Sequence, residues 1–323
     1  MGEPSMSKEV SRRRFLGKSL AAAAAAASFE ERSLLARTER PASGSAAPAV
    51  GSLPGGLPAG RIGPLAVSRV ICGGNLISGF AHSRDLIYVS PLLKHYFTDE
   101  RVFATFELCE EQGINTAILR VDADIERIIS RYWNERGGRI QWIAQVKPKE
   151  TDLESDIRKA VDLGAVGAYV QGGVGDSFVE QGKVELLGRA LEIIRAAGVV
   201  GGLGAHRLET VKACVAAGLA PDFYMKTLNG KGYWSAGLLP RNDSVWEETP
   251  EETIAFMRDI QIPWIAFKVL GAGAIHPREG FRYAFQNGAD FICVGMFDFQ
   301  VVEDVILARS ALDGLDRGRP WLG

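Results

Sequence analysis

The stretch QWIAQVKPKETDLESDIRKAVDLGAVGAYVQ, residues 141–171, predicts one unit of strand, helix and strand. Two short apolar runs, Gln141–Val146 and Gly167–Val170, enclose an amphipathic segment, Asp152–Leu163. Continuous apolar runs of this length are typical of strands buried on both faces, as in a parallel sheet. Thr151 is of a residue type that begins helices, and Gly164 is of the type that ends them in a left-handed turn. The stretch therefore predicts a parallel α/β fold.

The same alternation continues on both sides of this unit, from about Arg61 onward. Eight strand–helix units over about 250 residues are the number and size of a (β/α)8 TIM barrel. A doubly wound open sheet is the alternative, but no G-x-G-x-x-G turn follows the first predicted strand. We therefore expect a closed barrel. The predicted strands are Ser68–Cys72, Asn115–Leu119, Gln141–Val146, Gly167–Val170, Val200–Gly204, Asp222–Met225, Trp264–Phe267 and Asp290–Val294.

The N-terminus predicts export of the protein. Residues 11–16 (SRRRFL), followed by Lys18 and an alanine run, resemble the twin-arginine translocation signal. The resemblance implies that the twin-arginine machinery carries the chain across the cytoplasmic membrane, to the periplasm or another extracytoplasmic space. The alternative is an ordinary basic start to an alanine-rich helix. We expect a signal peptide over residues 1–27, a flexible Ala/Pro/Gly/Ser linker over 28–60, and the barrel domain over 61–323.

Composition and charge exclude several classes of protein. With 46% hydrophobic and 24% charged residues, the 323-residue chain has the composition of an ordinary globular protein. A net charge of −2 provides no field that would attract nucleic acid. The apolar N-terminal stretch is too short and too weakly hydrophobic for a permanent membrane span. The cysteines lack the spacing of zinc ligands, so we expect buried thiols and no metal site; they are Cys72, Cys109, Cys214 and Cys293.

Several segments after Arg61 together resemble the aldo-keto reductase superfamily. Residues 61–69 (RIGPLAVSR) are similar to the opening hairpin of that family, and residues 110–115 (EEQGIN) to its approach to the second strand. Residues 202–206 (GLGAH) resemble the end of its fifth strand. Residues 268–273 (KVLGAG) and 294–296 (VGM) resemble its phosphate-side turns. The resemblance covers about residues 61–312 and implies an aldo-keto-reductase-like barrel. It also implies NAD(P) as the cofactor, with phosphates cradled at Gly271, Gly273 and Gly295.

The catalytic residues of that family are not retained in this chain. The family uses an Asp, Tyr, Lys and His tetrad to reduce a carbonyl. The corresponding positions hold Ile118, Ala123, Val146 and Gln171. Lys147 lies one residue after the Lys position, and a one-residue shift in a strand turns a side chain to the other face. The positions of the Arg and Asn that hold the phosphate of NADP are occupied by Asp298 and Val305. We therefore do not expect conventional NADPH-dependent reduction, and the cofactor stays open.

In a (β/α)8 barrel the functional residues lie at the carboxyl ends of the strands. Several cations and few acids follow the predicted strands, which suits an oxygen-rich, anionic substrate such as a sugar acid; the alternative is a rim of structural salt bridges. His206 is the best candidate for proton transfer, because the pKa of a histidine lies near neutrality. The catalytic candidates are His206, Lys147, Lys226, Lys268 and Asp122. Candidates for binding a small polar substrate, many of them on two long loops, are Asn75, His82, Arg84, Asp85, Tyr88, Arg120, Gln171, Asn229 and Trp234.

Three hypotheses about function follow from the sequence. The first is an exported, aldo-keto-reductase-like barrel enzyme that acts on a small sugar-like or carbonyl compound by proton transfer. The second is an NAD(P)-dependent oxidoreductase with a rearranged site. The third is a non-catalytic barrel that binds a polar ligand. A substitution of His206 separates the first hypothesis from the third, because it lowers the rate of turnover only if the protein is an enzyme.

Overall fold

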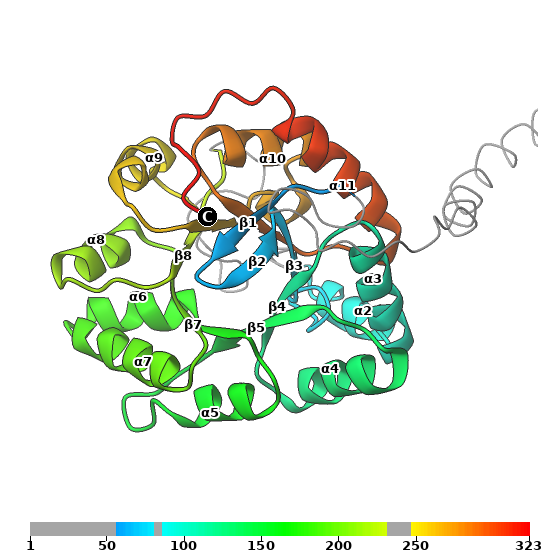
Figure 1. The fold of residues 1–323 in the computed structure, drawn as a ribbon, viewed down its shortest axis with the longest axis horizontal. Coiled ribbons are helices and arrows are strands. Elements are labelled where there is room, and N and C mark those ends of the chain that lie inside the picture. The colour runs from blue at the N-terminus through cyan, green and yellow to red at the C-terminus, as the bar shows by residue number, and fades with distance from the viewer. Residues whose placement is uncertain (1–55, 81–85, 231–246) are drawn as a thin grey trace, which may run out of the picture. The chain divides into compact units, whose positions relative to one another are not determined.

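Eight parallel strands close into a barrel in the computed structural model, which describes residues 56–80, 86–230 and 247–323 (Figure 1). Each strand pairs with the next along the chain, and the last pairs with the first. The predicted (β/α)8 architecture and all eight predicted strands are confirmed, with ends that differ by at most two residues. The strands are β3 (Val70–Gly73), β4 (Thr116–Arg120), β5 (Gln141–Val146), β6 (Gly167–Val170), β7 (Val200–Ala205), β8 (Phe223–Thr227), β9 (Trp264–Phe267) and β10 (Phe291–Val294).

Helices form a ring around the barrel (Figure 1). Gly113, Gly164 and Gly198 follow three of them with φ of 88°, 97° and 78°, so the predicted left-handed helix ends are confirmed. Their apolar faces pack on the outer side of the strands. The helices are α2 (Val89–Tyr96), α3 (Asp99–Glu111), α4 (Ala123–Arg136), α5 (Ser155–Asp162), α6 (Gly172–Glu180), α7 (Val184–Ala196), α8 (Leu208–Ala216), α9 (Pro250–Asp259), α10 (Pro277–Gln286) and α11 (Asp298–Leu312), with a short turn η1 (Gly271–Gly273) before α10.

Side chains along each strand alternate between the lumen of the barrel and the side that faces the helices. On β5, Ile143 lies in the lumen cluster, whereas Trp142 lies in the core between strands and helices. On β8, Met225 lies in the lumen and Tyr224 lies outside it. This alternation decides which polar residues at the strand ends point toward the mouth of the barrel.

An antiparallel hairpin closes the amino end of the barrel. It consists of β1 (Ala59–Ile62) and β2 (Leu65–Ser68), as the resemblance of residues 61–69 implied. Ile62 and Val67 are fully buried in the lumen cluster. Nε2 of Gln141, at the start of β5, donates a hydrogen bond of 2.9 Å to the carbonyl oxygen of Ala66. Figure 1 shows the hairpin lying across the end of the barrel. A substrate would therefore enter the lumen from the carboxyl ends of the strands.

Part of the predicted organisation lies outside the described residues. This applies to the signal peptide over 1–27 and to most of the linker over 28–60, which stay predictions. At the start of the described part, Leu57 is fully buried and β1 begins at Ala59, so the fold begins ahead of the boundary predicted at Arg61. None of the helices within the described ranges combines the length and the apolar character that a membrane crossing needs.

Candidate active site

His206 and Asp176 form a hydrogen-bonded pair at the mouth of the barrel. His206 follows β7, and Asp176 lies in the middle of α6. Nδ1 of His206 and Oδ2 of Asp176 are 2.8 Å apart, and the two side chains are 13% and 11% exposed. His206 continues the lumen side of β7, because Val200 lies in the lumen cluster and the two positions are six residues apart. The imidazole also packs against the ring of Phe267, with centroids 5.4 Å apart.

The surroundings of this pair determine its protonation state. Burial raises the pKa of Asp176, but hydrogen bonds from the ring and backbone of His206 and from Oγ1 of Thr210 outweigh it, so the pKa is lowered. Burial lowers the pKa of His206, and the charge of Lys268 lowers it further, against the opposing effect of Asp176. An ionised carboxylate only accepts hydrogen bonds, so Nδ1 of His206 carries the proton. The imidazole is then neutral at pH 7, with a lone pair on Nε2.

Glycines allow α6 to approach the end of β7 closely enough for this contact. A Cβ on Gly175 would lie 2.4 Å from the carbonyl oxygen of Gly204. A Cβ on Gly172 would lie 3.0 Å from Cε1 of His206. Because neither glycine carries a side chain, α6 rests directly on the backbone of β7 and on the imidazole. The position of Asp176 therefore depends on this close packing.

Gly175→Ala is expected to disturb the pair. The new methyl group would overlap backbone that cannot move aside as a flexible side chain could, so we expect a loss of about 1–3 kcal/mol in the free energy of unfolding. Urea denaturation measures the loss. The matched control is Gly173→Ala in the same helix, where the nearest atom is the end of the Gln171 side chain at 3.2 Å. That control should change stability by less than about 1 kcal/mol. Equal stability of the two variants would contradict the close approach.

The opposite side of the mouth brings together Arg120, Asp122 and Lys147. Nε of Arg120 lies 2.8 Å from Oδ2 of Asp122. Oδ1 of Asp122 accepts a hydrogen bond of 3.0 Å from the backbone N of Ile125, which caps the start of α4. Both oxygens of Asp122 are thus engaged in holding Arg120 and the helix. Asp122 therefore has the contacts of a positioning residue rather than of the catalytic residue that we expected.

Lys147 directly follows β5 with an exposed side chain, and it continues the alternation of the lumen side, although the family's Lys corresponds to Val146. Val146 is buried in the core between strands and helices. Gln145, two residues before Lys147, accepts a hydrogen bond of 2.9 Å from the hydroxyl of Tyr169, which belongs to the lumen cluster. Residues two apart on a strand share a face. The one-residue shift therefore places the amine, rather than Val146, on the side of the mouth.

Four further lumen residues, none of them among the predicted site residues, form the floor of the mouth. They are Tyr169, Gln145 and Phe267, together with Cys293 of β10. Burial raises the pKa of the Cys293 thiol above its ordinary range, so the thiol stays protonated. Cys72, Cys109 and Cys214 are buried as predicted, whereas Cys293 is only half-buried. Tyr169 lies two residues before Gln171, and this spacing of residues on one face was the signal that could have identified the phenol.

Lys226 faces away from the lumen, so its predicted place among the mouth residues is wrong. It lies one residue after Met225, which points into the lumen, and its side chain is fully buried. Its Nζ forms an ion pair with Glu247, which is 2% exposed. Oδ1 of Asn229 accepts a hydrogen bond from the backbone N of Glu247, and Nδ2 of Asn229 donates to the carbonyl oxygen of Lys268. Lys226 and Asn229 therefore hold together the chain on either side of residues 231–246.

The remaining predicted residues lie at different depths of the rim. Oε1 of Gln171 accepts a hydrogen bond of 3.1 Å from the backbone N of Val174 and caps α6. Lys268 is half-buried beside His206, with a left-handed φ of 59°. Asn75 and Tyr88 are exposed. His82, Arg84, Asp85 and Trp234 lie outside the described residues.

The residues at the turn before α11 do not fit the phosphates of NAD(P). Asp298 is the first residue of α11, where backbone N–H groups would otherwise favour a phosphate. Its carboxylate accepts hydrogen bonds from the hydroxyl of Tyr96 and from Nη1 of Arg101. A Cβ on Gly295 would lie 3.1 Å from Leu76, so little space is left there. Gly271 and Gly273 have positive φ in η1, but two glycines do not make a dinucleotide site.

No group of three or more His, Cys, Asp or Glu side chains within the described ranges is placed to hold a metal ion.

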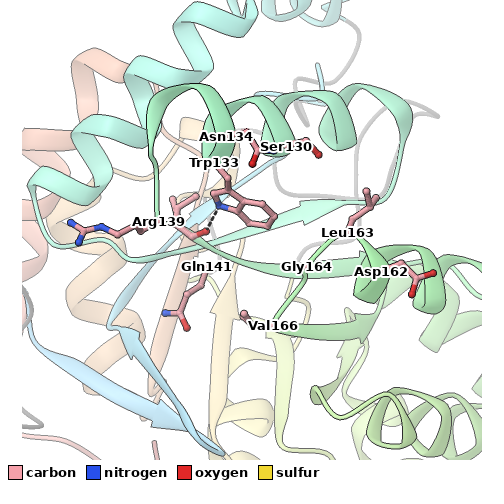
Figure 2. A pocket seen from close by; sticks show the side chains of 10 residues that line it. Ser130, Trp133, Asn134, Arg139, Gln141, Asp162, Leu163, Gly164 and Val166 are labelled. Atoms are coloured by element: carbon pink, nitrogen blue, oxygen red, sulfur yellow. Dashed lines mark hydrogen bonds between the residues drawn. The ribbon is translucent and has the colours of Figure 1, made fainter.

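A cleft of 540 Å³ lies at the other end of the barrel, between α4 and α5 (Figure 2). One wall is Trp133, whose Nε1 donates a hydrogen bond of 3.0 Å to the carbonyl oxygen of Ile140. Arg139 and Asp162 are its ionisable side chains. We place the candidate site at the mouth instead, where the perturbed ionisable groups converge.

Comparisons with known proteins bear on the fold. No family model and no curated protein matches the chain. A Pseudomonas aeruginosa structure described among the aldo-keto reductases matches with a TM-score of 0.55 and 16% identity, over 82% of this chain and 98% of the other. A second structure from that organism, with a similar description, has a TM-score of 0.54 and 16% identity, over 79% and 94%. A truncated 3-deoxy-D-arabino-heptulosonate 7-phosphate synthase from Thermotoga maritima has a TM-score of 0.51 and 12% identity, over 81% and 95%.

Identities this low carry no activity from one protein to another, because one barrel fold supports many chemistries. They do agree with the closed eight-stranded barrel. The chain is an aldo-keto-reductase-like (β/α)8 barrel in fold.

Proposed function

We propose that this protein is an enzyme that moves a proton on a small sugar-like or carbonyl compound, with His206 as the general base. The observation that carries the proposal is the Asp176–His206 pair at the mouth, 2.8 Å apart and largely withdrawn from solvent. A carboxylate that holds Nδ1–H fixes the tautomer and leaves Nε2 as the base. His206 needs no further activation, because burial already keeps it neutral at pH 7.

In the proposed reaction, Nε2 of His206 takes the proton from a carbon next to a carbonyl group. The electron pair of the C–H bond forms a carbon–carbon double bond, and the carbonyl electrons move onto oxygen to give an enolate. Lys268, whose charge acts on His206, stabilises the negative oxygen. The enolate then turns its other face to the imidazolium and takes the proton back on the same carbon, which gives the epimer. Alternatively, the proton of the hydroxyl group on that carbon moves to the enolate oxygen, and the imidazolium protonates the former carbonyl carbon, which gives the isomer. The products are an epimer or an isomer, and no other reactant is consumed.

The residue types at the mouth favour this reaction over nicotinamide-dependent reduction. At the tetrad positions, Ile118 is an apolar lumen residue and Gln171 caps α6. Tyr169 places a phenol in the floor of the mouth, but burial raises its pKa, and its hydroxyl donates a hydrogen bond to Oε1 of Gln145. A phenol in these surroundings is a poorer proton donor than an exposed one.

The test is exchange of carbon-bound hydrogen in D2O, followed by proton NMR with a panel of small aldoses, ketoses and their acids. We expect a substrate of the panel to lose the signal of the hydrogen next to its carbonyl. Because the deprotonated imidazole is the active form, kcat/KM should rise with pH and level off above the pKa of His206. That pKa lies below the ordinary value of 6.5, so the rate levels off at a lower pH than it would with an unperturbed histidine. Binding without exchange across the panel would support the ligand-binding barrel instead.

A further inference from the structure

Arg120 ends β4 and Lys147 directly follows β5, so the two cations lie at the carboxyl ends of neighbouring strands; Arg120 is half-buried and Lys147 is exposed. Arg120 is the last residue of β4 and is paired in register with Gln145 of β5. Gln145 is bonded to Tyr169 of the lumen cluster, and Lys147 lies two residues beyond it on the same face. β6 separates β5 from β7, which carries His206. The two cations therefore occupy one side of the mouth, and the imidazole lies farther around the rim.

Two contacts hold the guanidinium of Arg120 in one orientation. Asp122 binds it at Nε, 2.8 Å away. The ring of Phe80 packs against its face, with the guanidinium carbon 4.7 Å from the ring centroid. Neither contact uses the outer edge formed by Nη1 and Nη2. Within residues 56–80, 86–230 and 247–323, no acceptor forms a hydrogen bond with Nη1 or Nη2 of Arg120 or with Nζ of Lys147.

Arg120 and Lys147 repel each other, and a bound anion would reduce that repulsion. Partial desolvation by the surrounding chain lowers the pKa of Lys147, and the neighbouring Arg120 lowers it further, while Asp156 and Asp122 only partly oppose these effects. A bound anion would stabilise both cations at once. The edge of a guanidinium matches the two oxygens of a carboxylate, which it binds through two parallel hydrogen bonds. A phosphate dianion fits less well, because Asp122 and Asp156 add negative charge beside the site.

We propose that Arg120 and Lys147 form a carboxylate subsite, so that the substrate is a small sugar acid or related hydroxy acid rather than a neutral sugar. The inference rests on the proposed function for the reaction itself, but it assigns the substrate class from a different part of the mouth. When the carboxylate of the substrate binds at the ends of β4 and β5, its carbon chain can extend across the mouth toward His206. Phe80 and Asp122 are positioning residues that keep the guanidinium edge directed at the substrate.

The experiment compares two probes that differ only at one end. D-gluconate carries a carboxylate where D-glucitol carries a hydroxymethyl group. We expect the wild-type protein to bind gluconate at least about 10-fold more tightly in calorimetry, since a charged hydrogen-bonded pair has that effect on affinity. Arg120→Gln should weaken gluconate binding by about 10- to 100-fold and leave glucitol binding unchanged. Lys147→Gln should weaken it less, because an ammonium provides no bidentate edge.

The matched control is Lys149→Gln, an exposed lysine of the same segment, which should not change the affinity for gluconate. Circular dichroism of each variant verifies that it is folded, and Lys147→Gln tests the subsite even if loss of Arg120 affects folding. Equal affinity for gluconate and glucitol overturns the proposal, as does unchanged gluconate binding in both variants. Tighter binding of inorganic phosphate than of gluconate overturns the assignment to a carboxylate.

Failure of the proposed function would look different. Gluconate binding that depends on Arg120 and Lys147, without hydrogen exchange on any acid of the panel, supports the subsite and contradicts proton transfer alone. Exchange on neutral sugars that is insensitive to both substitutions contradicts the subsite alone.

Discussion

Asn in place of His206 is expected to lower the rate of carbon–hydrogen exchange by about 10²- to 10⁴-fold, the usual contribution of a general base. Asn retains a polar side chain of similar reach but has no lone pair that accepts a proton at pH 7. The fold should be preserved, because the backbone N of residue 206 still donates to Asp176. The measurement is the initial rate of exchange in D2O at several pH values. The rise of the rate with pH in the acid range, which we call the acid limb, should vanish together with the activity.

Asp176→Asn is the complementary variant. An amide at this position no longer requires the proton on Nδ1, so the tautomer with Nε2 as base is lost in part of the molecules. We expect a rate loss of about 10²-fold. We also expect the acid limb of the remaining activity to move to lower pH, because Asp176 raises the pKa of His206. A purely structural role of Asp176 would lower stability but leave the pH of this limb unchanged.

Thr210→Val provides the control for that structural role. It removes the hydrogen bond of 2.8 Å to Oδ1 of Asp176 and leaves the bond to His206 in place. The variant should lose about 1 kcal/mol of stability, the usual effect of one hydrogen bond, and keep the exchange rate within a few-fold of wild type. If Thr210→Val and Asp176→Asn lower the rate equally, the pair is not the catalytic unit.

Lys226→Met is expected to cause the largest loss of stability, about 3–5 kcal/mol. Lys226 is fully buried, and its partner Glu247 is 2% exposed. Removal of the ammonium leaves a buried carboxylate without its counter-charge, which is more costly than the loss of the pair itself. Nζ of Lys226 also donates to the carbonyl oxygen of Thr227, and that bond is lost as well. The midpoint of urea denaturation measures the effect.

The double variant Lys226→Met, Glu247→Gln tests this reason. Without the negative charge, most of the lost stability should return, because a neutral pair no longer carries the desolvation cost of an ion. Lys183→Met is the matched surface control: it breaks the ion pair with Glu150, which is 56% exposed, and should change stability by at most about 1 kcal/mol. If Lys226→Met is as mild as that control, Lys226 and Glu247 do not form a buried pair in solution.

The sequence by itself determined the barrel. The apolar runs and their spacing, as in Gln141–Val146 and Gly167–Val170, depend on local periodicity, which each segment carries without reference to the others. Glycines such as Gly164 determine helix ends locally, because the left-handed turn needs no distant partner. The positions of His206, Arg120 and Lys147 at strand ends follow from the same pattern, and the structure places all three at the mouth.

Only the tertiary structure decided which of these residues act together. Asp176 lies within a helix in the sequence and reaches His206 only because α6 rests on β7 at Gly175 and Gly204. One residue of register decided that Lys147 continues the lumen side of β5 and that Lys226 faces the helices, where it meets Glu247. Burial and partners are set by contacts between elements distant along the chain. Local sequence patterns carry no information about such contacts, whereas they do specify where each strand ends.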